Sequence, residues 1–227
     1  MSTPFYVSPE QWYQDKAEYA RKGIARGKPI AALEYEGGVS LMAENRSATL
    51  RKISEIYDRI AFAGVGKFDE YENLRKAGVR YCDMRGYSFC RDDVAARNLA
   101  NEYSTVLGSI FTREAKSFEV EVLVAEVGAD TTTLYQITYD GSITDHTQFA
   151  AIGGGAEDLR AVLESGWKPS MSLSEAVALG IQALTKAPNG SSDLDERSLE
   201  LAVIERARPG RKFRRFDRQE VRELLAG

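Results

Sequence analysis

The grouping of helix-like and strand-like segments limits the possible folds of this chain more than any single motif. The segments run as one helix, four strands, two helices, four strands, two helices, two strands and a last helix. Short turns such as Gly37-Gly38 and Asp140-Gly141 join consecutive strands, so neighbouring strands are expected to be antiparallel. Because helices come in blocks and do not alternate with strands, a doubly wound fold is excluded. The sequence predicts an α+β fold in four layers, α–β–β–α: two stacked, mainly antiparallel sheets with helices on both outer faces, in one domain over residues 1–227.

A polar helix is predicted over residues 9–26, before the first strand. Ser8 is its expected N-cap, and Gln11 stands at N3, which is the spacing of a capping box. The predicted apolar face is thin and consists of Tyr13, Ala17, Ala20 and Ile24. Such a face leaves two alternatives open, because the helix can pack on its own domain or against a helix of another subunit.

Composition and charge exclude several classes of protein. The net charge is −4 and no basic stripe dominates, which argues against a nucleic-acid partner. No apolar run approaches the roughly 20 residues that a membrane span needs, and the N-terminus has no signal-peptide pattern. We therefore expect a cytoplasmic protein. Cys82, Cys90 and the single His146 fit no zinc pattern, so neither a metal nor a cofactor is expected, and the roles of these three residues stay open.

Three motifs suggest chemistry and fail closer inspection. The stretch Ala61–Phe68 resembles a phosphate loop, but it lacks the first glycine and the Ser or Thr that binds magnesium. The glycines Gly153–Gly155 precede a helix and could cradle an anion, although Glu157 and Asp158 in its first turn would repel one. His146 lies in no G-x-S-x-G context that would supply a nucleophile.

Lys52 is the more informative candidate. It lies in the strand-like stretch Leu50–Ser54, where alternation puts Leu50, Lys52 and Ser54 on one side. A strand lysine that points into a cleft can bind a carboxylate. The alternative is an ordinary lysine whose stem packs on apolar groups while its ammonium stays in water.

Several separated stretches carry a family resemblance. Residues 18–33, "EYARKGIARGKPIAAL", resemble the helix-into-first-strand signature of proteasome α-type subunits. The stretches "LRKISEIYDRIAFAGVGKFDEYENLRKAG", "LYQITYDGSI" and "SLELAVIERARPGRKFRRF" are similar to the actinobacterial branch of that family. The resemblance runs from about residue 5 to residue 225, and it implies the N-terminal-nucleophile (Ntn) hydrolase fold.

The resemblance implies a structural and gating role in place of catalysis. Such α subunits form heptameric outer rings of the 20S proteasome core and control entry to the chamber of the β subunits, where the threonine protease activity resides. The position equivalent to that threonine is about Lys28, and the helix before it leaves no free amine there. The implied partners are neighbouring α subunits, β subunits, an AAA ATPase activator and unfolded protein in transit, in ATP-dependent, Pup-linked degradation.

The resemblance also implies site residues. Lys52, with Gly66 and Glu18, would form the pocket between subunits that takes the activator's C-terminal carboxylate. Residues 1–7 would be the gate over the pore and residues 8–27 the α-specific helix, with the sandwich over residues 28–227. The gate residues are Met1, Ser2, Thr3, Pro4, Phe5, Tyr6 and Val7. Since "STPFYVSPEQ" lacks the Y-D-R gate motif of archaeal and eukaryotic relatives, the gate contacts of those relatives are not transferred.

Two other classes of function stay open from sequence. One is a catalytically active Ntn-type peptidase or amidase with its own nucleophile. The other is a small-molecule binder that uses the corner at Gly153–Gly155. The capped helix before the first strand argues against the peptidase, and the native mass of the chain distinguishes a ring-former from a binder.

Overall fold

The computed structural model describes residues 8–47, 49–188, 190–191 and 194–226. The helices are α1 (Pro9–Ala25), α2 (Phe68–Ser88), the short 3-10 turn η1 (Arg91–Asp93), α3 (Ala96–Arg113), α4 (Ala156–Gly166), α5 (Leu173–Lys186) and α6 (Arg218–Ala226). The strands are β1 (Ile30–Tyr35), β2 (Gly38–Glu44), β3 (Ile53–Tyr57), β4 (Ile60–Gly66), β5 (Val120–Val127), β6 (Thr132–Ile137), β7 (Ile143–His146), β8 (Phe149–Ile152), β9 (Leu199–Glu205) and β10 (Phe213–Arg215). Apart from η1, this is the element order that the sequence predicts.

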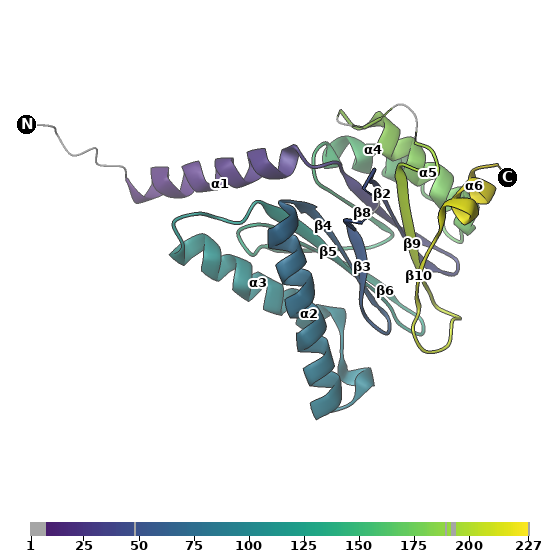
Figure 1. The fold of residues 1–227 in the computed structure, drawn as a ribbon, viewed down its shortest axis with the longest axis horizontal. Helices are drawn as coiled ribbons and strands as arrows, with labels where there is room; N and C mark the ends of the chain where they lie inside the picture. Colours follow the sequence, from purple (N-terminus) through teal and green to yellow (C-terminus); the bar gives the residue numbers. More distant parts are fainter. Residues whose placement is uncertain (1–7, 48, 189, 192–193, 227) are drawn as a thin grey trace, which may run out of the picture.

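The strands form two five-stranded antiparallel sheets, in the orders β10-β9-β2-β1-β8 and β3-β4-β5-β6-β7. Helices α4 and α5 cover the outer face of the first sheet, and α2 and α3 cover the outer face of the second (Figure 1). Three apolar clusters fill the spaces between the layers, one under each helix pair and one between the sheets. The predicted four-layer α–β–β–α sandwich is confirmed.

The strand β5 is buried on both faces. Its alternation of Val with Glu in "FEVEVLV" is typical of a half-exposed strand, and that interpretation is wrong. Val122 and Val124 pack under α2 and α3, whereas Leu123 and Ala125 pack between the sheets. Glu121 is also buried, and its carboxylate accepts from Gly153 N at 2.8 Å. A strand in a central layer packs against other layers on both faces, so neither face contacts water.

The start of α3 differs from the sequence expectation, which has one helix running from Arg91. The side chain of Arg59 donates to the carbonyl oxygens of Asp92 (3.0 Å) and Val94 (3.3 Å), and Glu126 accepts from Ala96 N at 2.8 Å. These long-range contacts hold the segment as a 3-10 turn followed by an extended link. The helix therefore begins at Ala96.

Helix α1 packs on its own domain through its second half and projects beyond the sheets with its first half (Figure 1). Its buried residues are Lys16, Ala20 and Ile24, whereas Tyr13 is 39% exposed. The backbone N–H of Gln11 donates to Ser8 Oγ at 3.2 Å, as expected for an N-cap. The side-chain amide of Gln11 donates to Asp15. The predicted apolar face is thus half right: Ala20 and Ile24 are buried as predicted, but Lys16 is buried with them.

None of the helices within the described residues is long and apolar enough to cross a membrane.

Candidate functional site

Lys52 lies at the edge of a cavity of about 400 Å³ at the entrance to β3. It directly precedes the strand and does not belong to it, although its carbonyl oxygen still accepts from Gly64 N at 3.0 Å. Its Nζ donates to the carbonyl oxygen of Lys28 at 2.9 Å. No carboxylate of the described residues comes within ion-pair distance of this ammonium, so it can still donate toward the cavity.

Burial lowers the pKa of Lys52 to about 8. The negative charges of Glu200 and Glu44 oppose this shift, and the positive charge of Lys28 adds to it. Near pH 7 the side chain still carries its proton, because the pH lies below that pKa. A poorly solvated ammonium with one backbone acceptor is a strong donor to an incoming carboxylate.

The cavity is also lined by a carboxylate that already has partners. Glu44 accepts from Lys28 Nζ at 3.1 Å and from Ser191 Oγ at 2.6 Å. Burial opposes its ionisation, but the hydrogen bonds from Ser191 and Lys28 outweigh burial and lower the pKa of Glu44. Glu44 therefore stays ionised with its own partners, and Lys52 remains the donor for an external anion.

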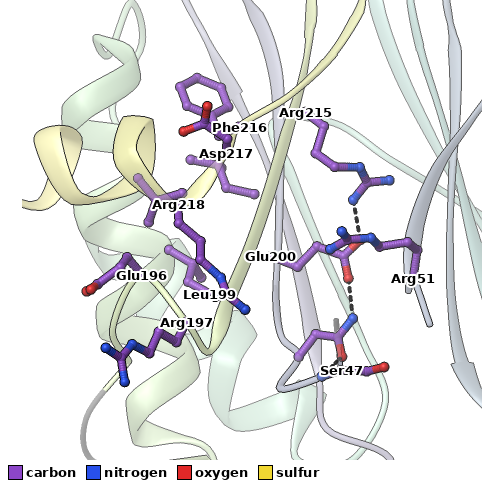
Figure 2. A pocket seen from close by; sticks show the side chains of 13 residues that line it. Ser47, Arg51, Glu196, Arg197, Leu199, Glu200, Arg215, Phe216, Asp217 and Arg218 are labelled. Carbon is purple, nitrogen blue, oxygen red and sulfur yellow. Dashed lines mark hydrogen bonds and ion pairs between the residues drawn. The ribbon is translucent and has the colours of Figure 1, made fainter. Parts of the chain in front are cut away.

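Glu200 of β9 holds the backbone of Lys52 in place, and sequence reasoning missed it. This residue is 4% exposed and accepts from Lys52 N at 3.1 Å and from Ile53 N at 3.2 Å. Asn45 and Arg215 bind the same carboxylate, and Figure 2 shows Arg215 approaching it from above. The signal in the sequence is one acidic residue in the otherwise apolar run "LELAVI", which indicates a buried carboxylate with partners.

Gly66 ends β4 close to the link between α1 and β1. Its φ is +108°, and a Cβ there would lie 1.8 Å from the carbonyl oxygen of Glu119, so only glycine fits. A Cβ on Gly27 would come within 3.3 Å of Gly66 N, which shows how closely the two segments approach. Gly66 therefore lies against the residue that precedes Lys28, at the end of β4, the strand that pairs with β3.

Glu18 lies on exposed α1 and pairs with Lys22 at 2.6 Å. The hydrogen bond from Lys22 lowers the pKa of Glu18. Within one chain, Glu18 does not line the Lys52 cavity. The joint pocket of Lys52, Gly66 and Glu18 stays a prediction, and the predicted gate, residues 1–7, lies outside the described residues.

The other candidate residues have structural partners. His146 contacts Gln136 Oε1 at 2.7 Å, and burial lowers the pKa of its imidazole. Cys82 is a buried free thiol whose pKa burial raises to about 12, whereas Cys90 is exposed. Within the described ranges no three His, Cys, Asp or Glu side chains gather as a metal site.

The glycine corner borders a cavity of about 640 Å³, and two of its backbone donors are occupied. Gly153 N donates to Glu121 and Gly154 N donates to the carbonyl oxygen of Gly27 at 3.2 Å. Glu157 and Asp158 line the same cavity. Because these two donors are used internally and four acids line the space against two arginines, this corner disfavours an anionic ligand.

Comparison with known proteins gives a consistent result. The sequence profile of the family described as "Proteasome subunit" matches residues 24–204. A protein named "Proteasome subunit alpha" from Kineococcus radiotolerans is 51% identical over 100% of this chain and 99% of its own length. Proteins of the same name from Thermobifida fusca and Saccharopolyspora erythraea are 50% and 51% identical over 99% of this chain, covering 91% and 89% of their own lengths.

Proposed function

The chain belongs to the proteasome subunit family, on the branch of the actinobacterial α subunits, and from this premise we propose that it is a non-catalytic subunit of the 20S core. It would form the heptameric outer ring on the β subunits, which carry the threonine protease activity. Residues 1–7 would close the pore, residues 8–27 would form the α-specific helix and residues 28–227 the sandwich. The process would be cytoplasmic, ATP-dependent and Pup-linked degradation of unfolded protein.

One observation carries the docking part of this proposal: a half-buried ammonium that lines a cavity and has no carboxylate partner among the residues that the structure describes. Lys52 Nζ donates to one backbone oxygen, and the cavity beside it is open to a ligand. The C-terminal carboxylate of an ATPase activator supplies the missing charge. Gly66 of this chain would leave room beside that carboxylate, and Glu18 would act at the boundary between subunits, since within one chain it lies away from Lys52.

The position equivalent to a catalytic threonine supports the non-catalytic assignment. Lys28 stands there, its backbone continues from α1 through a peptide bond, and its side chain pairs with Glu44. An active Ntn-type peptidase would need a free amine and a nucleophile at this point.

The test is a particle assembled from this chain and its β subunit. Replacing Lys52 by Ala should abolish stimulation of protein degradation by the ATPase, while the particle still assembles. The matched control is Lys186→Ala, which removes an exposed lysine at the end of α5 and should leave stimulation unchanged. Full stimulation of the Lys52→Ala particle would remove this residue from the docking pocket.

The gate is tested separately by deleting residues 1–7. Without activator, the shortened particle should hydrolyse long peptides faster than the full-length one, and an equal rate would contradict a gate there. A chain that stays monomeric and does not co-assemble with a β subunit would overturn the whole proposal.

A further inference from the structure

A second pocket lies beside the Lys52 cavity and is lined by arginines. Its volume is about 290 Å³, and it lies between the loop after β2, the start of β9 and the segment that leads into α6. Figure 2 shows Arg51 entering from the β3 side and Arg218 reaching from the start of α6 into the same space. Arg197 lies at the rim. We call this space, which Arg51, Arg197 and Arg218 line, the arginine pocket.

The three guanidinium groups have no partner among the described residues. Within the described residues, none of their side chains forms a hydrogen bond, ion pair or ring contact. Each is therefore free to bind a ligand. All three arginines are exposed, and together they produce a local positive potential on a chain that is acidic as a whole, with a net charge of −4.

The acids in the wall offset these arginines only in part, because two of the three already pair with other arginines. Glu200 is buried and binds Arg215. Glu196 pairs with Arg222 at 2.8 Å. Asp217 caps α6, where it accepts from Gln219 N at 2.8 Å and from Glu220 N at 2.9 Å. Positive charge therefore remains in surplus around the pocket after these pairs are taken into account.

The arginine pocket adjoins the Lys52 cavity. Asn45 lines both spaces, and Arg46 lines the Lys52 cavity together with a third hollow that Arg197 and Arg218 share. Arg51 and Lys52 are adjacent in sequence and line different cavities. An extended peptide advances about 3.3 Å per residue, so a side chain a few residues before the chain end can lie in a neighbouring cavity.

We propose that the arginine pocket binds an acidic side chain of the docking protein, a few residues before the C-terminal carboxylate that Lys52 takes. This inference rests on the docking function proposed above and extends it. Arg51 and Arg218 approach from two sides, and guanidinium groups bind a carboxylate through paired N–H donors. The pocket then selects among tails by their charge, whereas Lys52 recognises the chain end that all tails share.

Two synthetic tail peptides test the proposal on the assembled particle. Both end in the same residues with a free carboxylate; one carries glutamates about three to five residues before the end, and the other carries glutamines there. The particle variants are Arg51→Gln/Arg218→Gln, Lys52→Ala, and Arg208→Gln as a control that removes an exposed arginine in the β9–β10 turn. Fluorescence anisotropy gives the dissociation constants at low and high salt.

We expect the acidic peptide to bind the unmodified particle about tenfold more tightly than the neutral one at low salt, and less selectively at high salt. In Arg51→Gln/Arg218→Gln this preference should fall to within about twofold, while Arg208→Gln keeps it. A preference that survives the double substitution, or is absent from the unmodified particle, overturns the proposal. Failure of the docking function is seen separately, because it leaves both peptides unaffected by Lys52→Ala.

Discussion

Two lysines of this chain lose much of their contact with water, and the structure uses them in opposite ways. Lys16 of α1 is 6% exposed and donates to two carbonyl oxygens at the end of α3, those of Phe111 (2.5 Å) and Glu114 (2.6 Å). Its ammonium also lies 4.3 Å from the Trp12 ring centroid. Lys52 has a single backbone acceptor and a cavity beside it.

The comparison shows that burial alone does not mark a functional lysine. Burial lowers the pKa of both side chains, so that property does not separate them. The two lysines differ in how many of their N–H donors are bonded within the chain. Lys16 satisfies helix-terminal carbonyls and ties α1 to α3, whereas Lys52 retains donors for a ligand.

The largest effect is expected from removing the support of Lys52. Replacing Glu200 by Ala leaves Arg215 without its buried partner and two backbone N–H groups without an acceptor. We expect a loss of about 3–5 kcal/mol in the free energy of unfolding, measured by denaturant titration. Glu200→Gln keeps a side-chain acceptor and should lose less; equal stability of Glu200→Ala and the unmodified chain would contradict a buried hub.

A smaller effect separates the two lysines directly. Replacing Lys16 by Met removes the donor to two carbonyl oxygens and should lower the free energy of unfolding by about 2 kcal/mol. The matched variant is Lys52→Met, which removes one bond and a costly buried charge, and should change stability by less than about 1 kcal/mol in either direction. If Lys52→Met destabilises the chain as much as Lys16→Met, the comparison fails.

The smallest effect is a pH dependence of docking. With a pKa of about 8, Lys52 is mostly protonated at pH 7 and mostly neutral at pH 9. The affinity for a tail carboxylate should therefore fall by about tenfold between these values, measured by anisotropy. Lys52→Arg keeps its charge and should remove the decline; a flat profile in the unmodified particle would place this pKa well above 9.

The lowered pKa of Lys52 also changes the stability of the fold with pH in a defined direction. The pKa of Lys52 in the folded chain lies below the value of 10.5 that it takes when unfolded, so the unfolded chain binds more protons between about pH 8 and 10.5. Stability from this residue therefore rises with pH through that window.

The sequence predicts the order of the layers correctly. It predicts less well which side of a helix or strand faces the core. The spacing of Ser172 and Glu175 predicts a capping box, and Asp58-Arg59 is typical of a turn; both are local features, and the structure has both. The apolar periodicity of α2 and α3 puts Ala77 and Val106 on buried faces, but both residues are exposed, whereas Gly78 and Leu107 are buried. A one-residue rotation of a helix face is decided by the surface against which it packs.

The candidate site shows the same division. Lys52 could be selected from its position in "LRKIS" together with the family resemblance. Its supporting carboxylate comes from Glu200, which is 148 positions away, and no local pattern joins the two. The arginine pocket likewise combines segments around residues 51, 197 and 218.

The sequence by itself determined the order of the elements, the caps at Ser8 and Ser172 and the family. The tertiary structure alone decided that β5 is buried on both faces, that Lys16 is saturated and that Lys52 faces a cavity. Propensity, caps and turns depend on residues a few positions apart. The saturation of a buried charge depends on acceptors that folding brings from far away, such as those 95 and 98 positions from Lys16.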